Sequence, residues 1–239
     1  MASSRKDISQ PSSRDEVDAF LAKVNATPAP VAAANEGRQG RLMFAMDATA
    51  SREPSWDQAC HIQSEMFDAT ASLGGLDVQL CYFRGFREFR ASSWVMDARR
   101  LARLMGSVRC AGGRTQIGRA LEHALAETRT TPVNALVFIG DCMEEDIDAL
   151  CASAGELGLL GVPVFIFHEG RDHVAERCFR EICRLSRGAY CRFDAGSAEH
   201  LRELLGAVAV YAAGGRKALA DLGERRGGAI RQLSHDLNR

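Results

Sequence analysis

Short hydrophobic runs alternate along this chain with longer segments whose apolar residues recur every three or four positions. A short apolar run bounded by polar residues is typical of a buried strand, whereas the wider spacing indicates one face of a helix. The strands predicted in this way are residues 41–47, 76–83, 86–92, 134–141, 162–170 and 189–194. The predicted helices are residues 54–72, 96–108, 112–128, 144–158, 173–186 and 197–213, the last capped by Ser197.

This alternation predicts an α/β sandwich in which helices cover both faces of a mostly parallel six-stranded sheet. The tight turn Arg84-Gly85 makes one edge strand antiparallel. Such sheets bind ligands at the carboxyl ends of their strands, where the strand order reverses. Asp47 and Asp141 end two of the predicted strands, so a functional site is expected beside them.

The regular pattern begins only after an N-terminal arm, residues 1–40. The arm contains one short amphipathic helix with Ser13 as its N-cap, followed by a linker rich in Pro and Ala. The apolar face of this helix would consist of Val17, Phe20, Leu21 and Val24. It could dock on the body or on a partner, or remain a loosely held tail. Residues 41–212 are the predicted domain, and residues 213–239 form a basic C-terminal tail.

The composition is that of an ordinary globular protein. Of the 239 residues, 46% are hydrophobic and 26% are charged, which excludes wholesale disorder. A formal net charge of −1 does not favour nucleic acid as a partner. No apolar run is long enough to span a membrane and no secretory signal is evident, so we expect a cytoplasmic protein. The scattered cysteines include no C-x-x-C pair and are expected to be small buried hydrophobes.

The residues after the first strand suggest a binding site for a cation. Asp47, Thr49 and Ser51 occupy alternating positions, so one carboxylate and two hydroxyls can face the same crevice. Thr115 adds a third hydroxyl after two glycines, and Asp141 adds a second carboxylate from a neighbouring strand. Oxygen ligands with few formal charges suit a hard divalent cation. These five residues leave one coordination position vacant, which a Glu or Asp of a protein partner could fill.

These residues resemble the von Willebrand factor A (VWA) family and its metal-ion-dependent adhesion site. The family pattern is D-x-S-x-S after the first strand, a Thr within G-G-x-T-x-I-G-x-A-L, and an Asp that closes the fourth strand. Here these parts are Asp47-x-Thr49-x-Ser51, GGRTQIGRAL with Thr115, and IGD with Asp141. All three occur in the family's order, each at the matching strand or helix boundary.

The resemblance covers residues 41–212 and departs from the family pattern at two positions. Thr49 replaces the usual Ser; its hydroxyl can still ligate a metal, but its added methyl restricts the side-chain rotamers. Cys142 stands where the family commonly has Gly, which could give that loop another backbone path. Neither departure removes an oxygen ligand.

The resemblance implies a Rossmann-like three-layer sandwich, a bound Mg²⁺ that Mn²⁺ or Ca²⁺ can replace, and protein binding in place of catalysis. In that scheme Ser51, Thr49 and Thr115 ligate the ion. Asp47 and Asp141 act largely through bridging waters. The partner would present an acidic residue. Intracellular bacterial members often work beside AAA+ ATPases or in multiprotein assemblies, which the resemblance also implies here.

Two other functions compete with this interpretation. One is a VWA scaffold or assembly factor that binds its partners without metal. The other is a metal-dependent phosphohydrolase, because a strand-terminal Asp47 followed by Thr resembles the D-x-D-x-T phosphotransferases of the haloacid dehalogenase class. In that class the second Asp is the general acid and base, and Thr49 cannot do this work at neutral pH. We therefore expect no enzyme.

Charged residues suggest two further interpretations. Arg52 and Arg114 flank the metal-loop residues and could rim the site, where they would steer an acidic ligand. Five other arginines of this part of the chain are expected on solvated surfaces, namely Arg87, Arg90, Arg99, Arg100 and Arg103. His168 and His173 bracket two acidic residues, which raises the possibility of a zinc site. No second cluster completes such a site, so an ordinary polar loop is favoured there.

Overall fold

The computed structural model describes residues 14–28, 40–52, 76–193 and 205–213, and within these ranges it contains one sheet flanked by helices. The strands are β1 Gly40–Asp47, β2 Leu76–Arg84, β3 Glu88–Ala91, β4 Ala135–Gly140, β5 Val164–Glu169 and β6 Tyr190–Phe193. The helices are α1 Arg14–Ala26, α3 Ala98–Gly106, α4 Ile117–Thr130, α5 Ile147–Leu159 and α6 His173–Leu185, with a 3₁₀ turn η2 at Ala50–Arg52. A further helical stretch covers 205–213.

The strand order is β3-β2-β1-β4-β5-β6. Strands β2, β1, β4, β5 and β6 are parallel, and β3 pairs antiparallel with β2. The chain builds outward from β1 to β2 and β3 and then returns to β4 on the other side, so the strand order reverses beside β1. Asp47 ends β1 and Asp141 directly follows β4. Both aspartates therefore lie at the switch point of the sheet, where ligands bind in such folds.

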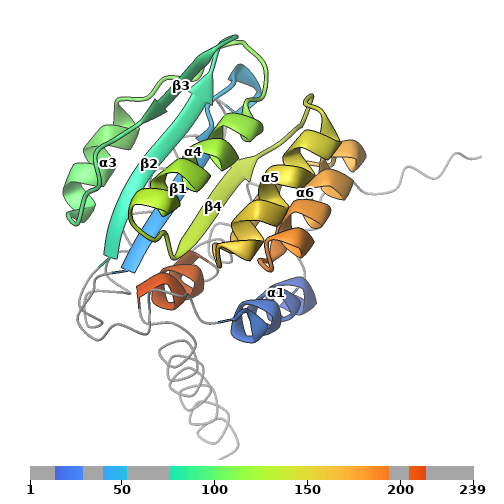
Figure 1. Cartoon of the computed structure of the whole chain (residues 1–239). Coiled ribbons are helices and arrows are strands. Elements are labelled where there is room, and N and C mark those ends of the chain that lie inside the picture. The colour runs from blue at the N-terminus through green and yellow to red at the C-terminus, as the bar shows by residue number, and fades with distance from the viewer. Residues whose placement is uncertain (1–13, 29–39, 53–75, 194–204, 214–239) are drawn as a thin grey trace, which may run out of the picture.

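The sheet is buried on both faces, as β1 illustrates. Leu42, Phe44 and Met46 pack with α1, α3 and the helix at 205–213, whereas Met43 and Ala45 pack with α4, α5 and α6. Figure 1 shows α4, α5 and α6 side by side over one face of the sheet. A strand covered on both faces is hydrophobic throughout, which is why β1 shows no alternation with polar residues. The predicted α/β sandwich, mostly parallel with one antiparallel edge strand, is confirmed.

The helix α1 packs on the body of the protein. Phe20 and Val24 are buried, and the ring of Phe20 lies 6.2 Å from that of Phe165 and 5.3 Å from that of Phe167, centroid to centroid. Burying one such aromatic side chain contributes about 2–3 kcal/mol. The hydroxyl of Tyr211 donates to the carbonyl of Pro28, so the helix at 205–213 also contacts the end of this segment. Of the alternatives for this helix, docking on the body is the one found.

Two predicted helices begin later than the pattern indicates, and both shifts shape the site. α4 begins at Ile117, because the residues before it form a loop that is held beside the end of β1 by a bridge between Thr49 and Ala111. α5 begins at Ile147 because Asp146 caps it, accepting a hydrogen bond from the amide of Ala149 at 2.8 Å. The residues before these caps are left free to form the loops around Asp47 and Asp141.

Several predictions concern residues outside the described ranges: Ser13, the linker after residue 28, the helix at 54–72, Ser197 and the tail from 214 onward. Within the described ranges, none of the helices combines the length and the apolar character needed to cross a bilayer.

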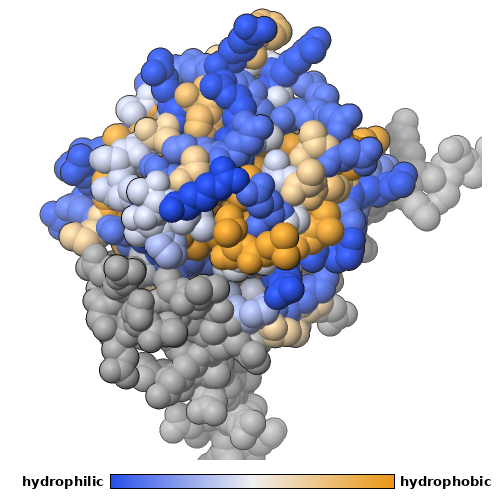
Figure 2. Space-filling view, viewed as in Figure 1, coloured by the Kyte–Doolittle hydropathy of each residue, from blue (hydrophilic) through white to orange (hydrophobic). Residues whose placement is uncertain are grey.

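The surface over α4, α5 and α6 is largely hydrophilic, with a hydrophobic area near the lower end of α5 (Figure 2). Leu159, 85% exposed, lies at that end of the helix.

Candidate metal centre

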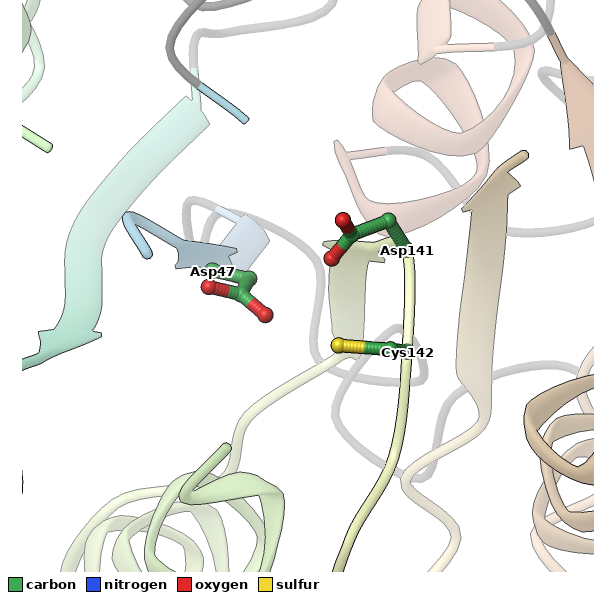
Figure 3. Close-up of side chains that lie close together, drawn as sticks. All are labelled: Asp47, Asp141 and Cys142. Carbon is green, nitrogen blue, oxygen red and sulfur yellow. The ribbon is translucent and has the colours of Figure 1, made fainter. Parts of the chain in front are cut away.

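Three side chains that could ligate a metal converge at the carboxyl ends of β1 and β4. Asp47 is completely buried, whereas Asp141 and Cys142, in the loop after β4, are half-buried. One carboxylate oxygen of each aspartate and the Sγ of Cys142 lie within 4.8 Å of one another. Figure 3 shows the three side chains directed into the same space from the two sides of the switch point. The predicted pair of carboxylates is therefore brought together.

Each aspartate has one carboxylate oxygen that lacks a hydrogen bond. Oδ1 of Asp47 accepts the amide of Thr49 at 2.7 Å. Oδ2 of Asp47 and Oδ1 of Asp141 are buried and have no hydrogen-bond partner among the residues that the structure describes. A buried carboxylate oxygen without a partner is costly, and a bound cation removes that cost. The residues therefore fit a divalent cation.

The electrostatics of the cluster also fit a cation. Burial raises the pKa of Asp47 to about 6, and the neighbouring Asp141 carboxylate contributes to this rise, although the hydrogen bonds from Thr49 oppose it. Burial likewise raises the pKa of the Cys142 thiol to about 12, and the negative charges of Asp141 and Asp47 add to the effect. Negative charge is thus disfavoured here without a counter-charge. A metal ion reverses this balance because it stabilises the deprotonated forms.

The hydroxyls of Thr49 and Ser51 lie next to Asp47 and contact each other. Their oxygens are 3.0 Å apart, and the amide of Thr49 is the donor to Asp47. Thr49 is buried whereas Ser51 is exposed. The turn η2 keeps both residues at the end of β1. The three residues of the D-x-T-x-S segment therefore form one hydrogen-bonded group.

Thr115 reaches the same end of the sheet on the loop segment 111–115. The amide of Ala111 donates to the carbonyl of Ala48 at 3.0 Å, which holds this segment beside the end of β1. The hydroxyl of Thr115 accepts the amide of Glu144 at 3.1 Å, so it contacts the loop after β4. A Cβ at Gly113 would lie 2.0 Å from the carbonyl oxygen of Gly85, so only glycine fits there. Hydrogen bonds thus join the three loops that carry the predicted ligands.

The two predicted rim arginines differ. Arg114 is exposed beside the turn between β2 and β3, and its amide donates to the carbonyl of Gly85 at 3.1 Å. Arg52, in contrast, is only 1% exposed, and its Nε lies 2.8 Å from the carboxylate of Glu169 at the end of β5. The side chain of Arg52 points into the protein because it pairs with this carboxylate. Arg52 therefore cannot meet a ligand at the rim, and instead joins η2 to the sheet.

The two histidines do not form a metal site together. His168 is buried, and its Nε2 lies 3.1 Å from the carbonyl oxygen of Asp141 while its Nδ1 lies 2.8 Å from the hydroxyl of Tyr190. A carbonyl can only accept, so Nε2 carries the proton and Nδ1 accepts from Tyr190. Burial lowers the pKa of His168, which favours this neutral form. His173 is 88% exposed at the start of α6. The polar-loop interpretation is the better one, and His168 supports the backbone of Asp141.

Sequence reasoning missed two contributions to the site. Cys142 was noted only as a departure from a family pattern, because its approach to Asp47 depends on how β1 and β4 pair. Glu145 caps α4: its carboxylate accepts the amides of Ile117 at 2.5 Å and Gly118 at 2.9 Å. The only sequence signal for either residue is its place just after a predicted strand-end Asp.

No protein-family model and no curated protein sequence matches the chain. Solved structures do match. The SpRpn10 VWA domain has a TM-score of 0.57 and 13% identity, over 70% of this chain and 94% of that one. An aerotolerance-related membrane protein from Bacteroides fragilis NCTC 9343 has a TM-score of 0.53 and 19% identity, over 70% and 98%. Proximal thread matrix protein 1 from the mussel byssus, with a zinc-occupied MIDAS motif, has a TM-score of 0.58 and 15% identity, over 72% and 46%. Such identities establish the fold alone.

Proposed function

Since this chain has the fold of VWA domains, we propose that it is a metal-dependent protein-binding module. A divalent cation between the ends of β1 and β4 would hold an acidic residue of a protein partner. The observation that carries this proposal is the pair of buried carboxylate oxygens, on Asp47 and Asp141, that lack a hydrogen-bond partner in the described part of the chain. Both aspartates belong to the same cluster at the switch point.

The residues proposed to hold the cation are Asp47, Thr49, Ser51, Thr115 and Asp141. All of them offer oxygen atoms, which suits Mg²⁺, with Mn²⁺ or Ca²⁺ as substitutes. When bound, the cation supplies positive charge and a coordination position that a carboxylate can occupy. The hydroxyl of Thr115 uses one lone pair on the amide of Glu144 and keeps a second for the ion.

The chain's own residues give this site its shape and its direction. The pair formed by Arg52 and Glu169 holds η2, and with it the hydroxyls of Thr49 and Ser51, against the end of β5. Arg114 lies exposed beside the site and would attract an acidic partner before contact is made. Asp47 and Asp141 lie at the ends of paired strands of the sheet, so the partner would meet a preformed surface.

A calorimetric titration with Mg²⁺ tests the metal site. Wild type should bind the ion with a measurable heat, whereas Asp47→Asn and Asp141→Asn should bind it at least about tenfold more weakly, because each loses a charged ligand group. The matched control is Asp148→Asn, an exposed aspartate on α5, which should bind as wild type does. Equal Mg²⁺ affinity in all four proteins would reject the metal centre.

Capture of partners from the source cell, with and without a chelator, tests the second half of the proposal. Partner binding that does not respond to the chelator or to Asp47→Asn would instead favour a metal-independent VWA scaffold or assembly factor. Partners that include an AAA+ ATPase would place the protein in that kind of intracellular assembly. Mg²⁺-dependent turnover of a generic phosphate ester, lost in Asp47→Asn, would favour the phosphohydrolase.

We propose the cytoplasm as the location of this protein. Buried free thiols such as those of Cys81 and Cys183 suit a reducing compartment of this kind.

The rim arginine provides a separate prediction. Arg114→Ala should reduce the amount of partner captured, and the difference from wild type should shrink as salt is added, because the interaction is between exposed charges. Its Mg²⁺ affinity should stay within about twofold of wild type, since the side chain is not a ligand. The control is Arg103→Ala, which removes an exposed arginine of α3 instead. Unchanged capture in Arg114→Ala would contradict a steering role.

A further inference from the structure

The thiol of Cys142 lies in the candidate metal centre, and a site made only of oxygen ligands gives it no role. Its Sγ lies within 4.8 Å of one carboxylate oxygen of Asp47 and one of Asp141. Figure 3 shows it directed toward Asp47 from the stretch of chain that also carries Asp141. A thiol beside two carboxylates gains only a weak hydrogen bond. A thiolate at the same place, together with a cation, makes a strong metal bond.

We infer that this centre is selective for a thiophilic divalent ion, Zn²⁺ in preference to Mg²⁺, and that its protein ligands are the Sγ of Cys142 and carboxylate oxygens of Asp47 and Asp141. This inference rests on the proposed metal site and specifies its ion. Thiolate ligands select Zn²⁺, whereas Mg²⁺ takes oxygen ligands. Three protein ligands leave a fourth position of a four-coordinate zinc ion open, as in zinc sites that bind an external ligand.

The hydrogen bonds of the site single out the same three residues. The hydroxyls of Thr49 and Ser51 pair with each other, and that of Thr115 accepts the amide of Glu144. Asp47, in contrast, is 0% exposed, and its Oδ2 has no hydrogen-bond partner within the described ranges. Asp47 also belongs to the group of possible metal ligands that contains the sulfur. Unsatisfied carboxylate oxygens and the thiol therefore occur in the same group of three residues, whereas each of the three hydroxyls already makes one hydrogen bond.

The dimensions and the proton balance are consistent with one ion. Two ligand atoms of a tetrahedral zinc ion are about 3.5 Å apart, so atoms within 4.8 Å of one another need only modest side-chain rotations to share it. On binding, the S–H bond of Cys142 breaks, its proton goes to the solvent, and the sulfur keeps the electron pair that forms the bond to the metal. No oxidant or reductant takes part in this step.

Zinc titration and cobalt spectroscopy of the full chain test the inference. Cys142→Ser should lower the affinity for Zn²⁺ at least about tenfold while changing that for Mg²⁺ less than about threefold, because the variant exchanges a soft ligand for a hard one. Co²⁺ added to wild type should give the near-ultraviolet charge-transfer absorption of a thiolate ligand, and Cys142→Ser should lose it. Cys151→Ser, which removes a partly exposed thiol on α5, should behave as wild type in both measurements.

The outcomes separate this inference from the proposed function. If wild type and Cys142→Ser bind Zn²⁺ equally and give the same cobalt spectrum, the thiol is not a ligand, although the metal site stands. If wild type binds neither Mg²⁺ nor Zn²⁺, the proposed function fails as well. Thermal unfolding in metal-free buffer establishes that each variant folds. Cys142→Gly, which introduces the residue common in VWA domains, gives a second variant for the same comparison.

Discussion

At the scale of single residues, Asp47 illustrates how this protein gives up stability to build a site. Its side chain is completely buried at the end of β1, and one of its oxygens has no hydrogen-bond partner in the described structure. Burial raises its pKa from 3.8 to about 6. The ionised form is therefore less stable in the folded protein than in the unfolded chain. A carboxylate with no role in binding would be easily replaced at such a position.

This pKa predicts how the metal-free protein responds to pH. Because the folded pKa is raised, ionised Asp47 destabilises the fold, and the cost appears as pH rises from about 4 to above 6, reaching about 3 kcal/mol. Asp47→Asn removes this cost. Relative to wild type, the variant should gain unfolding free energy between pH 4 and pH 7, measured by urea denaturation with a chelator present. A difference between the two proteins that stays constant with pH would contradict this assignment.

At the scale of elements, the site depends on the contact between segment 111–115 and the turn after β2. Gly113 lies against this turn because its backbone approaches the carbonyl of Gly85 more closely than any side chain would allow. The hydrogen bond from the amide of Arg114 to the same carbonyl fixes the contact. The segment then continues to Thr115, one of the proposed ligands. Backbone packing outside the candidate site thus positions a proposed ligand.

Alanine substitutions at the adjacent residues Gly112 and Gly113 distinguish the contact with Gly85 from the general effect of adding a methyl group. Gly113→Ala would place its Cβ 2.0 Å from the carbonyl oxygen of Gly85, whereas a Cβ at Gly112 meets nothing within 4 Å. Gly113→Ala should therefore cost about 1–3 kcal/mol of unfolding free energy and weaken Mg²⁺ binding, because the segment must move. Gly112→Ala should change neither quantity appreciably. Equal effects of the two substitutions, in denaturation and calorimetry, would show that the close approach is unimportant.

The second contact between elements is the buried ion pair between η2 and β5. Glu169→Gln leaves the charge of Arg52 in a buried position with a neutral partner, which should cost about 3 kcal/mol of unfolding free energy. Glu181→Gln is the control, because its pair with Arg184 on α6 is exposed and should contribute less than about 1 kcal/mol. Urea denaturation at neutral pH compares the two. A cost for Glu169→Gln no larger than that of the control would remove the positioning role of this pair.

At the scale of the whole molecule, a metal that binds only the folded state must stabilise the entire fold. The ligands come from β1, from the segment before α4 and from the loop after β4, which separate on unfolding. An ion at about one hundred times its dissociation constant therefore adds about 2.7 kcal/mol to the unfolding free energy. The midpoint of thermal unfolding should rise by several degrees when Mg²⁺ or Zn²⁺ is added to wild type. Asp141→Asn should show a smaller rise, and an equal one would place the bound ion elsewhere.

The sequence by itself determined the architecture and the strand ends at which the candidate site lies. Strand and helix periodicities are local properties, and they identified the sheet because its strands are short apolar runs. The strand-end positions of Asp47 and Asp141 were also readable, since parallel strands present their carboxyl ends at one edge. Helix boundaries were less accurate: α4 begins only at Ile117, because the residues before it form a loop in which Ala111 bridges to Thr49, just beyond the end of β1.

Only the tertiary structure decided how the side chains of the site are used. Arg52 turns inward because β5, far along the chain, ends in Glu169, and no local pattern encodes that neighbour. Cys142 faces Asp47 because β4 pairs with β1, which turns a deviation from a family pattern into a candidate ligand. The sequence names the groups available at a strand end. The pairing and burial of distant segments decide the rest. They determine which of these groups meet, which are satisfied by hydrogen bonds, and which need a cation.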